Sequence, residues 1–162
     1  YPGLQTLVQL TEYSFDTNTY TLPLVKVLDQ PAYVHRGLMI DSGRHFLPLP
    51  FVLRLLDGMA LAKLNVLHWH LTEDQSWPLA SRIYPEFAAK GSYSPWEQYS
   101  IANLQSVVQH AAGLGIRVIP EFDMPGHTTS WRASHPELFT SNCRSASRGA
   151  LDPANPKVYE VV

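Results

Sequence analysis

The chain contains 162 residues, of which 16% are charged and 45% hydrophobic, and its formal net charge is −2 at pH 7. This composition excludes a disordered tail. The small net charge gives no general affinity for nucleic acid or anionic membranes. No apolar run reaches the about 18 residues that a transmembrane helix needs. The single Cys cannot form an internal disulfide or a thiolate metal cluster.

The first part of the chain predicts a small α+β unit. Apolar residues at helical spacing over 3–11 indicate a short amphipathic helix. Alternation of polar and apolar residues over 13–28 indicates two strands joined by a turn. We therefore expect residues 1–30 to be the C-terminal part of an N-terminal α+β domain, and residues 31–162 to form a second unit.

The second unit alternates strands with helices. Apolar runs at 37–40, 65–71 and 116–122 predict three strands. Amphipathic stripes over about 48–63 and after Ser100, a good N-cap residue, predict two helices between them. A β-α-β-α-β order with apolar strands predicts an α/β fold in which a parallel sheet has helices outside it.

A doubly wound sheet and a (β/α)8 TIM barrel both fit this order. No glycine-rich phosphate loop follows the first strand, which weakens a dinucleotide-binding interpretation. Polar groups follow every strand: Asp41 the first, Glu73 and Asp74 the second, Glu121 and Asp123 the third. Functional groups at the carboxyl ends of successive strands are typical of a TIM-barrel active site. The long connection after the second strand indicates an insertion that contributes to such a site.

His68 and His70 alternate along the second strand, so both imidazoles point to the same side. One interpretation is a divalent metal site completed by Glu121, Asp123 and His127 from the third strand. The other is a pair of hydrogen-bonded structural histidines beneath the site. The pattern of residues leaves both interpretations open.

Acid–base and substrate-binding candidates lie around the same strand ends. Glu73 and Asp74 follow the two histidines, and a carboxylate near a histidine can orient it and stabilise its cation. The Pro-Gly turn before His127 is expected to aim this side chain back over the strand end. Arg36, at the start of the first strand, offers either a surface ion pair or a fork of donors for substrate hydroxyls or a carboxylate.

Four segments of the chain form a specific set of motifs: RGLMIDSGRHFLP (36–48), KLNVLHWHLTEDQSWP (63–78), PEFAAKGSYSP (85–95) and GIRVIPEFDMPGH (115–127). Through these segments the chain resembles the β-N-acetylhexosaminidases of glycoside hydrolase family 20, most closely the eukaryotic lysosomal type. The resemblance implies a partial (β/α)8 TIM barrel, preceded by the end of a small α+β domain. A complete barrel needs about 250 residues, so residues 31–162 would supply the first three βα units, truncated before strand four.

The resemblance implies a retaining exo-glycosidase that removes terminal β-linked N-acetylglucosamine or N-acetylgalactosamine from glycoconjugates or chito-oligosaccharides. The nucleophile of this family is the acetamido oxygen of the substrate itself. An Asp orients the acetamido group, and the neighbouring Glu is general acid and then general base. This pair follows the fourth strand in a Gly-Gly-Asp-Glu-like motif, which does not occur in this sequence. We therefore expect this chain alone to be inactive.

By the same resemblance, Arg36 would grip hydroxyls of the terminal sugar. His127 would position the acid together with the carboxylate that follows the second strand. The family commonly has Asp at the position of Glu73, and one extra methylene could displace the partner of His127 by about 1 Å, which can reduce catalysis. Asp74 could substitute for it. Four further residues would support the site: Asp41, His70, Glu121 and Asp123.

The resemblance implies neither a metal nor a cofactor. The expected ligands are terminal N-acetylglucosamine and N-acetylgalactosamine glycosides, with no role for nucleic acid or a membrane. The full-length protein would be lysosomal or secreted and could be a dimer, and a disulfide partner of Cys143 would lie beyond Val162. Two alternatives remain: a metal-dependent barrel hydrolase that uses His68 and His70, and a non-catalytic homologue that binds sugar or a partner subunit.

Overall fold

A computed structural model describes residues 2–140 and 149–162; Cys143 lies outside the described residues. The helices, strands and 3-10 turns follow one another in this order: α1 (Pro2–Leu10), β1 (Glu12–Ser14), β2 (Thr19–Thr21), β3 (Gly37–Asp41), α2 (Leu49–Leu61), β4 (Val66–Thr72), α3 (Glu86–Gly91), α4 (Ile101–Gly113), β5 (Arg117–Phe122), η1 (Thr129–Ala133), η2 (Pro136–Leu138) and α5 (Pro156–Val161). None of the described helices is long and apolar enough to cross a lipid bilayer.

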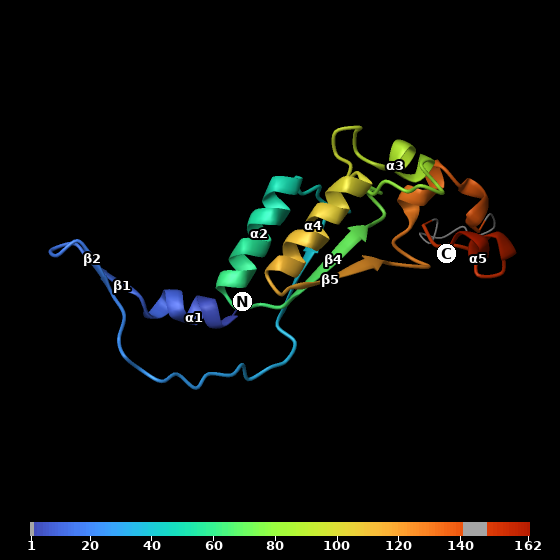
Figure 1. Cartoon of the computed structure of the whole chain (residues 1–162). Coiled ribbons are helices and arrows are strands. Elements are labelled where there is room, and N and C mark those ends of the chain that lie inside the picture. Colours follow the sequence, from blue (N-terminus) through green and yellow to red (C-terminus); the bar gives the residue numbers. More distant parts are fainter. Residues whose placement is uncertain (1, 141–148) are drawn as a thin grey trace.

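The centre of the structure is a three-stranded parallel sheet in the order β3-β4-β5. The register places Asp41 opposite His70, and His70 opposite Glu121. These three residues therefore form one row near the carboxyl ends of the strands. Helices α2 and α4 lie side by side and cover one face of the sheet (Figure 1). The parallel α/β arrangement predicted from the order of strands and helices is confirmed.

The hydrophobic core lies between β4 and these two helices. Leu67, Trp69 and Leu71 are buried, and they share one face because side chains alternate across a strand. They join one cluster with buried residues of the helices: Val52, Leu56 and Met59 of α2, and Val107 and Ala111 of α4. Burial of each large apolar side chain contributes about 1.5–3 kcal/mol. The same alternation turns His68 and His70 to the opposite face of the sheet.

The two long helices begin and end as their sequences predict. Ser100 caps α4, because its hydroxyl accepts a hydrogen bond from the backbone N–H of Asn103, and the Asn103 side chain accepts one in return from the N–H of Ser100. Helix α2 carries a proline, Pro50, in its first turn, where a backbone N–H would have no acceptor within the helix. Gly115, at φ +74°, follows the end of α4 and adopts the left-handed conformation that glycine tolerates.

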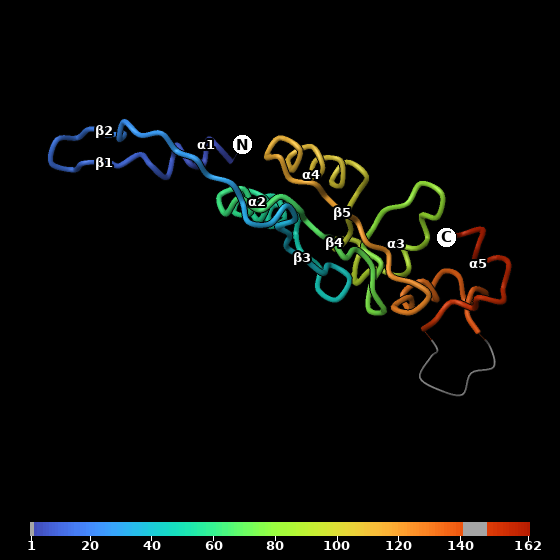
Figure 2. Tube along the Cα trace, turned by 90° about the horizontal axis from the view of Figure 1, so that it is seen from below, coloured from blue at the N-terminus to red at the C-terminus, as the bar shows by residue number. Residues whose placement is uncertain are grey.

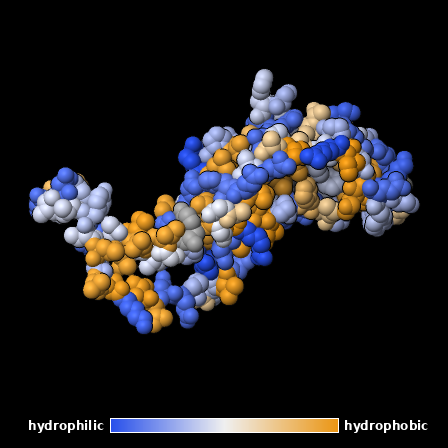
Figure 3. Space-filling view, viewed as in Figure 1, coloured by the Kyte–Doolittle hydropathy of each residue, from blue (hydrophilic) through white to orange (hydrophobic). Residues whose placement is uncertain are grey.

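The N-terminal segment forms an arm that extends away from the sheet (Figures 1 and 2). The predicted helix is present as α1, and β1 and β2 form an antiparallel hairpin. The second strand is shorter than predicted: it ends at Thr21, and residues 22–36 form neither a helix nor a strand. Pro23 lacks the N–H that a continuing strand would need. Apolar side chains are exposed along this arm (Figure 3): Leu4, Val8, Leu22, Leu24, Val25 and Leu28.

The long connection after β4 forms a compact aromatic layer beside the carboxyl ends of the strands. Trp77 stacks on Phe87 of α3, with ring centroids 4.5 Å apart, and meets Trp131 of η1 edge to face at 4.8 Å. Such pairs contribute about 0.5–1.5 kcal/mol beyond the area they bury. This layer holds α3 and η1 together and so fixes the loop that leads from β5 into η1.

Candidate functional site

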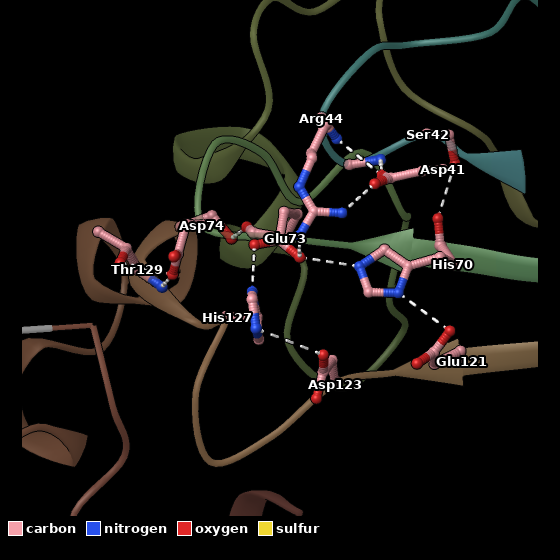
Figure 4. Close-up of polar contacts among 12 residues, drawn as sticks. Asp41, Ser42, Arg44, His70, Glu73, Asp74, Glu121, Asp123, His127 and Thr129 are labelled. Atoms are coloured by element: carbon pink, nitrogen blue, oxygen red, sulfur yellow. Dashed lines mark hydrogen bonds and ion pairs between the residues drawn. The ribbon is translucent and has the colours of Figure 1, made fainter. Parts of the chain in front are cut away.

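Polar side chains from all three strands meet at the carboxyl end of the sheet, as the strand order predicts (Figure 4). Asp41 comes from β3, His70 from β4 and Glu121 from β5, while Glu73 and His127 follow β4 and β5. The carboxyl ends of parallel strands lie at one edge of a sheet, so groups that are far apart in the chain converge there.

Glu73 is the centre of the cluster. Glu73 is only 1% exposed, and its carboxylate has three cationic or donor partners. Nδ1 of His127 lies 2.6 Å from Oε1, Nε2 of His70 lies 2.9 Å from Oε2, and a terminal nitrogen of Arg44 lies 3.1 Å from Oε2. Burial disfavours the charged carboxylate, but the hydrogen bonds from His127 and His70 outweigh it and lower the pKa of Glu73.

His127 lies in the loop after β5, where it adopts a left-handed conformation at φ +59°. Its hydrogen bond to Glu73, followed by the charge of that carboxylate, raises the pKa of His127. The other ring nitrogen, Nε2, lies 3.9 Å from Oδ2 of Asp123, and 46% of the side chain is exposed. One nitrogen is thus fixed on a buried carboxylate, while the other makes only this longer contact with Asp123 among the described residues, in a side chain that is half exposed.

Asp74 has a different partner from its neighbour Glu73. Its Oδ1 accepts hydrogen bonds from the backbone N–H of Thr129 at 2.9 Å and from the Thr129 hydroxyl at 2.7 Å. Burial opposes ionisation of Asp74, but these bonds lower its pKa. The hydroxyl of Ser130 donates to the backbone carbonyl of Glu73 at 2.6 Å. Asp74 and Ser130 therefore fasten the loop that carries His127, and Glu73 contacts the histidine itself.

The prediction that Arg36 lies at the site is wrong for this structure. Its Nε donates to the carbonyl of Lys63, and a terminal nitrogen donates to the carbonyls of Tyr33 and Val34. Arg36 precedes β3, so about 17 Å of strand separates it from Asp41 at the carboxyl end. A residue that enters a parallel strand lies at the opposite edge of the sheet from one that leaves it.

The arginine of the site is Arg44, which sequence reasoning missed. It forms an ion pair with Asp41 and lies 3.1 Å from the carboxylate of Glu73. The sequence contains a signal for it, because Arg44 follows the carboxyl end of β3 by three residues in the Asp-Ser-Gly-Arg turn. Half of its side chain is exposed, so the guanidinium is not enclosed by its two carboxylate partners.

Gly43 allows the turn after β3 to approach Glu73 closely. A Cβ atom at Gly43 would lie 2.6 Å from Cβ and 2.7 Å from the backbone nitrogen of Glu73. Neither atom can move without moving the strand end. The absence of a side chain at this position therefore permits the packing that brings Arg44 to the Glu73 carboxylate.

His68 and His70 point to the same side of β4, as the alternation predicts. Oε2 of Glu121 lies 2.6 Å from Nε2 of His68 and 3.0 Å from Nδ1 of His70. Atoms that could ligate a metal ion gather in two groups among the described residues. One group is His70, Glu121 and Asp123, and the other is Glu73, Asp123 and His127. His68 belongs to neither group. Both nitrogens of His70 already face carboxylates, so the arrangement favours hydrogen-bonded histidines over a metal site built on these two residues.

Comparison with known proteins identifies the family. Residues 33–162 match the model of the glycosyl hydrolase family 20 catalytic domain. The chain belongs to glycosyl hydrolase family 20. It is 44% identical over 156 residues to cat beta-hexosaminidase subunit beta, covering 95% of this chain and 29% of that protein. It is 43% identical over 155 residues to the human subunit beta, covering 95% of this chain and 28% of that protein.

Solved structures of family 20 enzymes have the same fold over nearly the whole chain. The chitobiase of Flavobacterium johnsoniae superposes with a TM-score of 0.86 at 33% identity, covering 99% of this chain and 25% of that one. The exo-β-N-acetylglucosaminidase of Vibrio harveyi, in complex with N-acetylglucosamine, gives a TM-score of 0.86 at 30% identity, covering 99% and 29%. This family 20 chain thus spans less than a third of the length of these relatives. The resemblance inferred from the four sequence segments is confirmed.

Proposed function

We propose that this chain supplies the supporting half of a β-N-acetylhexosaminidase active site, which hydrolyses terminal N-acetylglucosamine or N-acetylgalactosamine glycosides. The observation that carries the proposal is the 2.6 Å contact between His127 and the buried carboxylate of Glu73, beside Arg44. An oriented, half-exposed imidazole whose pKa is raised suits a residue that positions and tunes a general acid. The family membership of the chain and its similarity to a structure that holds N-acetylglucosamine support the same reaction.

Each residue of the cluster has a role in this proposal. Glu73 orients His127 and stabilises its cationic form, as a carboxylate does for an adjacent imidazole. His127 presents Nε2 to the acid Glu of the family. Arg44 takes the place first predicted for Arg36, because a guanidinium with free donors beside the site can hold sugar hydroxyls. Asp41 orients Arg44 through their ion pair.

The reaction itself needs the Asp-Glu pair of the family, in which Asp orients the acetamido group and Glu transfers the proton. No Gly-Gly-Asp-Glu-like motif occurs among the residues of this chain. We therefore propose that the 162-residue chain by itself does not hydrolyse glycosides, and that hydrolysis follows when the pair is supplied. Release of chromophore from an aryl N-acetyl-β-glucosaminide by the purified chain would contradict this part of the proposal.

The fold supports an assignment of domains. We propose that residues 31–162 are the first three βα units of a (β/α)8 barrel and that residues 1–30 end an α+β domain. Three strands pair in sequential order, with both helices on one face and a polar row on the other. The similarity to beta-hexosaminidase subunits leads us to propose that the full-length protein is lysosomal or secreted and can form a dimer.

A chimera tests the function directly. The 155 residues of human beta-hexosaminidase subunit beta that align with this chain are replaced by the chain, and hydrolysis of an aryl N-acetyl-β-glucosaminide is measured. The proposal expects a folded, active chimera and strong loss of activity in the Arg44→Ala variant, with little loss in Arg36→Ala. A folded chimera without activity would instead support a non-catalytic homologue. A Glu73→Asp variant of the same chimera measures the effect of the extra methylene.

A further inference from the structure

His70 is enclosed by two carboxylates. Its Nε2 lies 2.9 Å from Oε2 of Glu73, and its Nδ1 lies 3.0 Å from Oε2 of Glu121. The residue is 5% exposed, so solvent does not compete for these two contacts. The contact with Glu121 lies outside the Glu73–His127 pair on which the proposed function rests.

The partners of His70 favour its doubly protonated form. A neutral imidazole has one donor and one acceptor nitrogen, whereas an ionised carboxylate can only accept. Glu73 also accepts from His127 and contacts Arg44, and Glu121 also contacts Nε2 of His68 at 2.6 Å. The surroundings lower the pKa of both carboxylates, in keeping with ionised acceptors. A neutral His70 would turn a lone pair toward one of them, so the geometry favours a proton on both ring nitrogens of His70.

The electrostatic surroundings agree with this protonation. Burial opposes a charge on His70, but the hydrogen bonds to Glu121 and Glu73 outweigh it and raise the pKa of His70. Burial likewise opposes the charge of Glu121, but the hydrogen bonds from His70 and His68 lower its pKa. Helices α2 and α4 cover the other face of the sheet, and the titratable and charged groups around His70 come from the strands and the loops after them: Asp41, Arg44, His68, Glu73, Glu121, Asp123 and His127.

We propose that Glu121 holds His70 as a buried imidazolium, and that this cation positions the Glu73 carboxylate for His127. Oε2 of Glu73 is occupied by His70 and Arg44, which leaves Oε1 for His127. A carboxylate as buried as Glu73 needs such compensation to stay ionised. Glu121 and His70 are thus positioning residues that act through Glu73, and the meaning of this arrangement for catalysis rests on the proposed function.

Nuclear magnetic resonance of the 162-residue chain tests the inference without any activity. Nitrogen-15 labelling of histidine shows which ring nitrogens of His70 carry protons, and carbon-13 labelling follows the carboxyl group of Glu73. In the wild type we expect both nitrogens of His70 to be protonated at pH 6.5. The titration midpoint of the ring should lie above that of a histidine in a model peptide. In Glu121→Gln, which preserves size but removes the charge, we expect the His70 midpoint to fall by about one pH unit. The Glu73 midpoint should rise in the same variant.

The chain provides a matched control at His135. Its two nitrogens each lie 3.0 Å from a carboxylate, Nε2 from Glu86 and Nδ1 from Glu137, outside the site. Glu137→Gln should leave the His70 and Glu73 midpoints unchanged. The inference is overturned if wild-type His70 is mostly neutral at pH 6.5, if Glu121→Gln leaves its midpoint in place, or if both variants move it equally. The wild-type spectrum decides the protonation even if a variant does not fold.

The two proposals fail separately. An inactive chimera would remove the hexosaminidase function and leave the protonation of His70 as measured. A neutral His70 in the wild-type chain would remove the role of Glu121, while an active chimera would still support the hexosaminidase function.

Discussion

Nδ1 of His127 lies 2.6 Å from Oε1 of Glu73, although 54 positions separate the two residues along the chain. One partner is almost completely buried and the other is half exposed. Moving or hydrating the buried carboxylate would disrupt its packing, so the position of Glu73 determines the orientation of the exposed imidazole. Glu73 is therefore the rigid partner of the pair, and His127 is the solvent-accessible one.

The first prediction concerns which of two adjacent carboxylates controls His127. Glu73→Gln should lower the pKa of His127 toward the ordinary histidine value, because the hydrogen bond to Glu73 is the main cause of its raised pKa. Asp74→Asn is the matched control and should cause a much smaller decrease, since Asp74 hydrogen bonds to Thr129. Histidine titration by nuclear magnetic resonance measures both. Equal shifts in the two variants would contradict the assignment.

The second prediction concerns the pH dependence of stability. The pKa of Glu73 is lowered in the folded state, so its contribution is complete above the unfolded value of about 4.3 and is lost as the pH falls through the folded pKa. The pKa of His127 is raised, so its contribution is complete below about 6.5 and is lost as the pH rises through the folded pKa. The difference in free energy of unfolding between wild type and Glu73→Gln should therefore be largest between about pH 4.3 and 6.5.

Urea denaturation of both proteins over a series of pH values measures this difference. It should shrink on the acid side, where Glu73 takes up a proton, and on the alkaline side, where the histidines lose theirs. A difference that stays constant from acid to alkaline pH would mean that the charges of this pair do not contribute to stability.

The third prediction concerns the close approach of Gly43 to Glu73. Gly43→Ala should destabilise the fold by about 1–3 kcal/mol, since the new methyl group would overlap the strand end. Gly58→Ala is the control: Gly58 lies inside α2 with no atom within 4 Å of an added Cβ. There alanine should stabilise the helix by about 0.5–1 kcal/mol. Chemical denaturation measures both effects, and a Gly43→Ala protein as stable as wild type would refute the packing argument.

The fourth prediction concerns the cap of α4. Ser100→Ala removes the hydroxyl that accepts from Asn103 and should lower the free energy of unfolding by about 1 kcal/mol. Ser106→Ala changes the same residue type within the helix, where the hydroxyl donates to the carbonyl of Asn103, and should change stability by less than about 0.5 kcal/mol. Thermal or urea denaturation compares the two. Similar losses in both variants would indicate that the capping box is not the stabilising feature.

Local patterns in the sequence were enough to predict most elements of the fold. The alternation around Trp69, the apolar stripe of α2 and the Ser100 cap each depend on neighbours within a few positions, so their structure follows from local spacing. The strand predicted after the first turn of the arm is shorter in the structure, because strand length depends on a pairing partner as well as on composition. The collection of polar groups at the strand ends was predictable from the strand order alone.

The pairings within the site depended on the tertiary structure. Glu73 and Asp74 are neighbours with similar chemistry, and only the three-dimensional packing turns one toward His127 and the other toward Thr129. Arg36 and Arg44 flank β3, and the direction of that strand in the sheet places Arg44 at the site and Arg36 at the opposite edge.

The parallel α/β arrangement and the end of the sheet at which polar groups collect were predictable from the sequence, because both depend on spacing within short stretches of the chain. Four short segments likewise carried the resemblance to family 20. The connected series of hydrogen bonds from Glu121 through His70 and Glu73 to His127 is seen only in the folded chain. Hydrogen bonds form only within about 3 Å and depend on direction, so such a series exists only after the strands are set in register and the loops have closed over them.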